Sequence, residues 1–190
     1  VSDSALKQPN EKVRLSVIQR KQQSHPFVES SVIKYKGPDE ITVLRKERNP
    51  LASVVLDDGS IMFVDEGGRT LPYRLFENFA DLPLIRNVGN SERIDKNGLT
   101  KCLNIINEMR KPENRFLYHY LSEIVFSANS NSAEFKMRIA NLSVNFGKVD
   151  DIEAKIEKLR IYWLNENPLA GSTVSSINLQ WNDYLVVTEL

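Results

Sequence analysis

The segment from Glu40 to Pro72 constrains the fold most strongly, because it combines strand patterns with several turn signals. The side chains of residues 41–46 fall into two alternating sets, and this two-residue period is typical of a half-buried strand. Asn49-Pro50 ends this run, since proline donates no hydrogen bond to a sheet and moves its predecessor out of helical geometry. A strand that stops at a proline in this way predicts a boundary between two units.

The second half of the same segment predicts a hairpin. Two β-rich runs, 51–56 and 61–64, flank Asp57-Asp58-Gly59-Ser60, and Asp-Gly between such runs is a strong hairpin signal. Gly67-Gly68 then marks the next corner of the chain. We therefore expect a folded β-rich unit to begin immediately after Asn49.

The rest of the chain alternates between helical and strand patterns. The expected helices are 12–23, 99–111 and 149–165, and residues 115–120 fit either a helical turn or the entry to a strand. Asp150 and Asp151 suit the N-terminus of the last helix. The expected turns include 37–39, 96–98, 129–132 and 182–183, and the expected strands are 31–36, 122–128, 133–140, 142–146, 175–181 and 184–187.

Two helices show clear apolar stripes that predict a shared core. Leu99, Leu103, Ile106 and Met109 recur at helical spacing beside Cys102, and the last helix carries Ile152, Ile156, Leu159 and Trp163. In the first expected helix, Val13, Val17 and Ile18 cluster on one side. We interpret the chain as α+β, with an α-β-β unit followed by a mixed, mostly antiparallel β-domain with two helices.

Composition limits the classes of function. The formal net charge is zero, which argues against nucleic acid as the main partner. Residues 1–48 hold ten Lys/Arg against six Asp/Glu, a small excess that favours anionic lipid only weakly. Cys102 is the single cysteine, so no internal disulfide can form. No apolar run approaches the roughly 20 residues that a membrane-spanning helix needs.

Catalytic and metal-binding patterns are missing from the sequence. His25 and His119 lie in no metal-ligand spacing, and Cys102 falls on an apolar helix face, where a thiol behaves as a small hydrophobe. Asp57, Asp58, Asp65 and Glu66 could form a weak Ca²⁺ site, but solvated turn carboxylates are the favoured interpretation. We expect no enzymatic activity and no bound metal or cofactor. An enzyme with an unrecognised carboxylate pair is retained as a third hypothesis.

Several motifs resemble the bacterial cell-division family FtsQ/DivIB. The family has an E-R-x-P-x-A segment followed by a hairpin and a D-x-x-G turn, and this chain has ERNPLA at 47–52 and VDEGGRTLP at 64–72. LPLIRNVG at 82–89 and NFGKVDDIEAKIEKL at 145–159 also resemble family segments. INLQW at 177–181 is similar to a further motif, although Asn178 and Gln180 replace its usual Asp and Arg.

The resemblance implies two domains: a POTRA-like domain at 1–48, whose first strand is not recognisable, and an FtsQ-type β-domain at 49–190. Phe27 and Val28 would anchor the loop between the POTRA helix and its hairpin. A transmembrane helix would precede Val1, so the protein would be a single-pass protein of the inner (cytoplasmic) membrane with this part in the periplasm.

The resemblance also implies partners, namely FtsB/DivIC-like and FtsL-like division proteins. A terminal strand commonly lies at a sheet edge, where an incoming segment can pair with its backbone. Aromatic side chains are enriched at binding hot spots. We expect partner binding at Trp181, Tyr184, Leu185, Val186 and Val187, and contacts of the POTRA strand at Ile41, Val43, Arg45 and Arg48.

The expected function is a non-catalytic scaffold of the divisome in septum formation. The alternative is a POTRA-type accessory module of outer-membrane protein assembly or secretion. We rank this alternative lower because residues 149–165 are predicted to form a helix.

Overall fold

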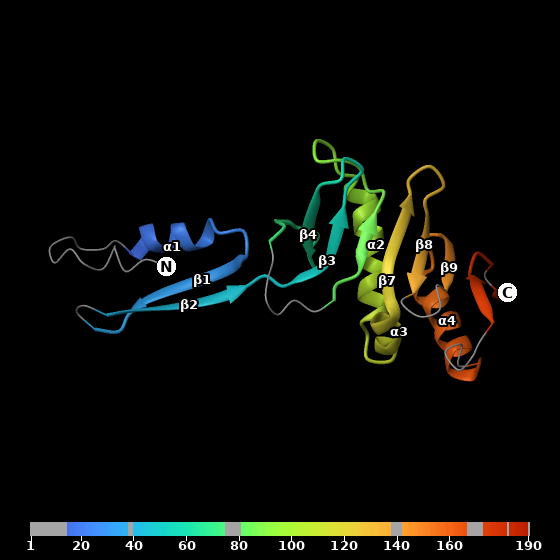
Figure 1. The fold of residues 1–190 in the computed structure, drawn as a ribbon. Coiled ribbons are helices and arrows are strands. Elements are labelled where there is room, and N and C mark those ends of the chain that lie inside the picture. The colour runs from blue at the N-terminus through green and yellow to red at the C-terminus, as the bar shows by residue number, and fades with distance from the viewer. Residues whose placement is uncertain are drawn as a thin grey trace. The chain divides into compact units, whose positions relative to one another are not determined.

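A computed structural model describes residues 15–37, 40–74, 81–137, 142–166, 173–181 and 183–189. The sequence expectations for 1–14, Pro38-Asp39, 138–140 and Asn182 lie outside these residues. The chain divides into two compact units, Val1–Asn49 and Pro50–Leu190. Figure 1 shows the elements of each unit in chain order.

The first unit contains a helix and an antiparallel hairpin. Helix α1 is Leu15–Gln23, and strands β1 (Val28–Tyr35) and β2 (Ile41–Glu47) pair antiparallel with a register shift between Val28 and Ser30. The Gln19 side chain donates to the main-chain oxygen of Ser31 at 3.2 Å, which ties α1 to β1. Phe27 and Val28, which follow α1, are both buried.

Two details of this unit differ from the sequence expectations. Strand β2 was expected to be half-buried, but all its residues beyond Thr42 are exposed, including Val43 and Leu44. Val17, expected on the buried side of the helix, is exposed as well. The alternating pattern located the strand correctly, because it reports the pleat, but it does not report whether another layer covers the apolar face.

The second unit is built on one nine-stranded sheet (Figure 1). The strand order is β11-β10-β9-β8-β7-β6-β3-β4-β5. Five neighbouring pairs are antiparallel and three are parallel, which confirms the mixed, mostly antiparallel α+β fold. The strands are β3 (Pro50–Val55), β4 (Ile61–Asp65), β5 (Thr70–Pro72), β6 (Leu84–Arg86), β7 (Leu121–Ser127), β8 (Ser132–Met137), β9 (Ser143–Lys148), β10 (Val174–Asn178) and β11 (Val186–Glu189).

The predicted hairpin at Asp57–Ser60 is confirmed and joins β3 to β4. The short strands β5 and β6 were not anticipated. Strand β6 runs parallel to both β3 and β7, so it connects the two halves of the sheet.

Helices α2 (Lys96–Met109), α3 (Arg115–Tyr120) and α4 (Ile152–Glu166) complete the second unit. Helix α2 packs against β7 and lies beside α4. The expected turn at 96–98 is wrong, because the Asp95 side chain accepts from the main-chain N–H groups of Asn97 and Gly98 and begins α2 three residues earlier. Residues 115–120 are helical, one of the two conformations that the sequence allowed.

One face of the sheet and the helices form the core. The predicted stripe of α2 is buried throughout, and so are Ile156, Leu159 and Trp163 of α4. These side chains meet the inward-facing residues of the sheet, among them Val54, Ile85, Ile124, Phe135, Val144 and Ile177. Cys102 is buried in the same cluster, as its position on the apolar face predicted.

Candidate partner-binding edge

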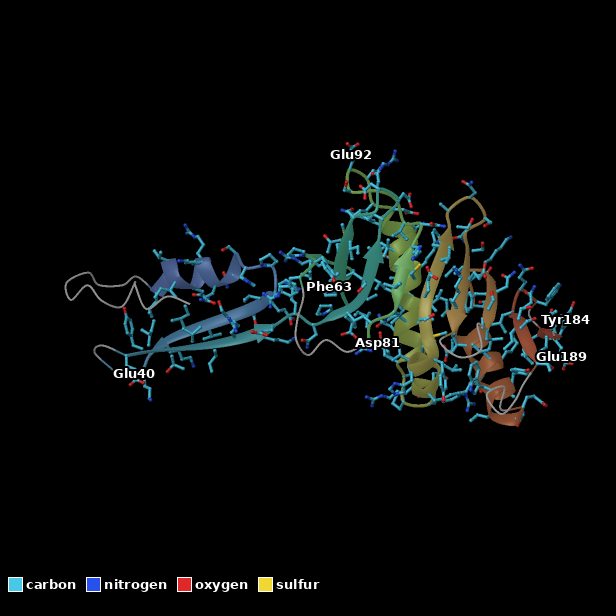
Figure 2. The ribbon with its side chains drawn as sticks, viewed as in Figure 1. Glu40, Phe63, Asp81, Glu92, Tyr184 and Glu189 are labelled. Carbon is cyan, nitrogen blue, oxygen red and sulfur yellow. The ribbon has the colours of Figure 1, made fainter. Side chains whose placement is uncertain are left out.

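Strand β11 lies at one end of the nine-stranded sheet. It pairs antiparallel with β10, and the described residues contain no strand on its other side. Figure 2 shows Tyr184 and Glu189 at this exposed end of the sheet. Alternate N–H and C=O groups of an edge strand point away from the sheet, so β11 offers hydrogen-bonding groups to an added strand.

The register of β11 separates its side chains between two faces. Val187 is paired with the buried Ile177, and its side chain is half-buried on the same face as the core. Val186 is paired with Asn178 on the opposite face and is 41% exposed. An added strand would therefore find an accessible apolar side chain at Val186 and a supporting one at Val187.

Trp181 and Tyr184 form an exposed aromatic pair before β11. Their rings stack with centroids 5.4 Å apart and an interplanar angle of 15°. The residues are 40% and 53% exposed, so much of this apolar surface is in contact with solvent. Leu185 packs partly against the core and fixes the chain between the aromatic pair and the strand.

The strand limits at this end differ from the sequence expectation. Strand β10 ends at Asn178 instead of Trp181, and β11 begins at Val186 instead of Tyr184. Asn178 accepts through Oδ1 from the main-chain N–H of Gln180 at 3.0 Å, which bends the chain directly after β10. Trp181 therefore leaves the face of Ile177 and Leu179, which are both fully buried.

Three further hydrogen bonds hold this bend in place. The Nζ of Lys158 on α4 donates to the main-chain oxygen of Trp181. Burial, together with repulsion from Lys155, lowers the pKa of Lys158 from its ordinary value. Asn145 on β9 accepts from the side-chain amide of Gln180 at 3.3 Å, and its main-chain oxygen accepts from Leu179 N–H. No local pattern in the sequence indicates the role of Lys158, because its contact with Trp181 spans 23 positions.

The residues expected to act on the POTRA strand lie along or just after β2. Ile41, Val43 and Arg45 occupy alternate positions and therefore share one face of the hairpin. Arg45 forms an ion pair with Glu47 at 2.5 Å, and Arg48 donates its main-chain N–H to Phe27. These four residues belong to the first unit, whereas the aromatic pair and β11 belong to the second.

The structure does not support the acidic cluster considered for Ca²⁺. Asp58 lies at the turn of the β3–β4 hairpin, whereas Asp65 lies at its opposite end, opposite Pro50. Asp58 binds Ser60 and Ser91, and Asp65 accepts from the main-chain N–H groups of Gly67 and Arg69. Across the described part of the chain, no three His, Cys, Asp or Glu side chains are placed to hold a metal ion.

The geometry defines an α+β protein whose accessible surface features suit association with another chain. A family model described as FtsQ/DivIB, C-terminal related, matches residues 49–188, and the chain belongs to this family. Membership in this family supports a role in cell division. The family consists of non-catalytic division proteins whose members associate with other divisome proteins. No curated protein matches the chain significantly.

The FtsQ/DivIB family is membrane-anchored with an extracytoplasmic domain. Among the helices that the structure describes, none is both long and apolar enough to cross a bilayer.

Proposed function

We propose that this chain is the extracytoplasmic part of a divisome scaffold that recruits FtsB/DivIC-like and FtsL-like proteins in septum formation. The single observation that carries this proposal is the edge position of β11 beside the exposed Trp181–Tyr184 pair. Strand addition there supplies affinity through backbone hydrogen bonds and specificity through side-chain contacts. The FtsQ/DivIB membership of residues 49–188 supports the same conclusion.

In this proposal the residues at the edge have different roles in binding. Val186 presents an apolar side chain on the face away from the helices, and Val187 and Leu185 keep the strand seated on the core. Trp181 and Tyr184 provide a flat apolar surface for a large side chain of the partner. Aromatic residues of this kind commonly dominate the binding energy of an interface.

The first unit has a different part in the proposal. Its α1–β1–β2 arrangement supports a POTRA-like domain at 1–48 preceding an FtsQ-type β-domain at 49–190. The exposed β2 strand, with Ile41, Val43, Arg45 and Arg48, would contact a further membrane-associated component of the divisome. Anchoring by a transmembrane helix in the inner membrane would hold both domains in the periplasm.

The test is binding of this chain to the extracytoplasmic part of a cognate FtsB-like protein, measured by calorimetry. Trp181→Ala removes the larger exposed ring, and we expect affinity to fall about tenfold or more because such anchors commonly contribute 2 kcal/mol or more. Val186→Pro and Val187→Pro sample the two alternating backbone orientations of β11, so one of them removes an outward N–H. Ile61→Ala, at an exposed position on β4, is the matched control.

The expected result is affinity weakened about tenfold or more by Trp181→Ala, and loss of binding for one proline variant whose circular dichroism matches the wild type. Unchanged affinity in both folded variants, with Ile61→Ala also unchanged, would place the partner elsewhere and end the strand-addition proposal.

A further inference from the structure

The aromatic pair Trp181–Tyr184 lies on a segment outside the regular strands. Strand β10 ends at Asn178, and β11 begins only at Val186. Side chains on such a segment ordinarily sample several positions, because backbone outside helices and strands has fewer hydrogen bonds to hold it. The value of the two rings to a partner therefore depends on what holds the main chain beneath them.

Strand β9 holds the first part of this segment. The main-chain N–H of Leu179 donates to the main-chain oxygen of Asn145 at 2.8 Å, and the side-chain amide of Gln180 donates to Oδ1 of Asn145 at 3.3 Å. The two chains also touch at Gly147, where a Cβ would lie 2.5 Å from Cγ and 3.2 Å from Cα of Gln180. These contacts fix the chain against the sheet up to the residue before Trp181.

Helix α4 holds Trp181 itself. The ammonium of Lys158 donates to the main-chain oxygen of Trp181, and a charge-assisted hydrogen bond of this kind is stronger than one between neutral groups. The carboxylate of Asp183 attracts the same ammonium and opposes the lowering of its pKa by burial and by Lys155. Lys158 therefore links the helical layer directly to the main chain of the aromatic pair.

The position of Trp181 also sets the position of its neighbour. The ring of Tyr184 stacks on that of Trp181 at 5.4 Å and 15°, and Leu185, the next residue, packs partly against the core. Ordering exposed side chains costs free energy when a complex forms, and a surface that is already ordered avoids this cost. Loss of the Lys158 hydrogen bond would thus weaken a complex without removing any group that touches the partner.

We propose that Lys158 is a positioning residue for partner binding, which fixes the Trp181–Tyr184 pair in the orientation that receives the partner. It acts through the main-chain oxygen of Trp181 and makes no contact with the partner. This inference rests on the proposed function, because it requires a partner at the β11 edge. The competing explanation is a direct ion pair between Lys158 and an acidic group of the partner, and the test separates the two.

The test is a double-mutant cycle in the full chain, with affinity for the extracytoplasmic part of a cognate FtsB-like protein measured by calorimetry. Lys158→Met removes the ammonium and keeps an unbranched stem, whereas Lys158→Arg keeps a cationic donor. Trp181→Ala, alone and combined with Lys158→Met, completes the cycle. Arg160→Met is the matched control, because it removes a cation of the same helix that binds Glu157 instead. Circular dichroism checks that each variant is folded, and Lys158→Ala is the second variant should Lys158→Met fail to fold.

We expect Lys158→Met to weaken binding about fivefold, and Lys158→Arg and Arg160→Met less than about twofold. In the Trp181→Ala background, Lys158→Met should change affinity by less than about twofold, because the ring through which it acts is gone. The free chain gives an independent readout. Nuclear Overhauser effects between the rings of Trp181 and Tyr184 should weaken in Lys158→Met and persist in Lys158→Arg.

Additive losses from Lys158→Met and Trp181→Ala would overturn the proposal and assign Lys158 to direct contact with the partner. Wild-type affinity in folded Lys158→Met, with binding still weakened by Trp181→Ala, would also overturn it and leave the proposed function intact. Wild-type affinity in Trp181→Ala would instead overturn the proposed site together with this inference.

Discussion

The Nζ of Lys155 lies 2.6 Å from Oδ1 of Asp150, and the two ends of this ion pair have very different environments. Lys155 is only 2% exposed, whereas the Asp150 side chain is 55% exposed. The same ammonium donates to the main-chain oxygen of Lys148 at 2.6 Å and lies 5.1 Å from the centroid of the Phe146 ring. This arrangement joins the start of α4 to the end of β9.

The asymmetry predicts that removing the exposed partner costs more than removing the buried one. Asp150→Ala leaves a buried ammonium without its counterion, which we expect to lower the free energy of unfolding by about 2 kcal/mol after allowance for solvent screening. Lys155→Met keeps the buried stem and leaves a carboxylate that water can solvate, so we expect a cost of about 1 kcal/mol. Urea denaturation measures both values. Glu153→Ala on the same helix should change stability by less than about 0.5 kcal/mol.

A second prediction concerns Gly98, which lies inside α2, where alanine would ordinarily be favoured. A Cβ there would lie 2.5 Å from Cε1 of Phe126 and 2.6 Å from Oδ2 of Asp95. We expect Gly98→Ala to destabilise the protein by about 1–3 kcal/mol, because the contact with a packed ring outweighs helix propensity. Thermal unfolding checks this change. Combination with Phe126→Leu should restore part of the loss, and full additivity of the two changes would contradict the steric explanation.

Cys102 provides a prediction about chemical reactivity. Burial, with a smaller contribution from the nearby charge of Asp95, raises the pKa of its thiol to about 12. The thiol is therefore protonated and inaccessible at pH 8, and we expect no reaction with Ellman's reagent in the native protein. One thiol per chain should react in denaturant, since the chain contains a single cysteine. Rapid reaction without denaturant would show that the α2 face opens readily.

The environment of Asp58 predicts that the stability of the protein depends on pH. Hydrogen bonds from Ser60 and Ser91 hold the pKa of its carboxyl well below its usual range. The unfolded chain therefore takes up this proton first as the pH falls. The stabilisation is fully present above the ordinary pKa of about 3.9 and is lost progressively below it. We expect the stability difference between wild type and Asp58→Asn to be larger at pH 7 than at pH 2.

Urea midpoints at the two pH values measure this effect. Ser91→Ala should reduce the same difference, because it removes one of the two hydroxyl groups that bind the carboxylate. A difference that stays constant with pH would show that the Asp58 carboxylate has the same proton affinity in both states.

Local signals in the sequence predicted most of the second unit. The Asp57–Ser60 hairpin, the stripe on α2 and the stripe on α4 follow from turn chemistry and periodicity, and each is present. The start of α2 was missed because Lys-Asn-Gly is typical of a turn, and the side chain of Asp95 outweighs that local preference by capping two N–H groups. Strand β6 was missed because its three residues join the sheet only through long-range parallel pairs.

The candidate sites could be predicted only in part. A terminal β-prone run indicated an edge, but the position of Trp181 depends on the side chain of Asn178 bending the chain. Away from that edge, Glu108 and Glu113 line one hollow together with residues of α4 about forty positions later. The periodicity of apolar residues does not predict these long-range contacts, which depend on how α2 and α4 pack together.

Strand β6 has a mechanical consequence. The strands from β3 to β5 and those from β7 to β11 are each continuous, but they are joined by three paired residues on each side of Leu84–Arg86. If β11 were pulled away from β5, every ladder of the sheet, including the two short ladders of β6, would carry the load. Rupture would then begin in one of the three-residue ladders, which are the two ladders of β6 together with β9–β10 and β4–β5, and not in the longer ladders β7–β8 and β8–β9.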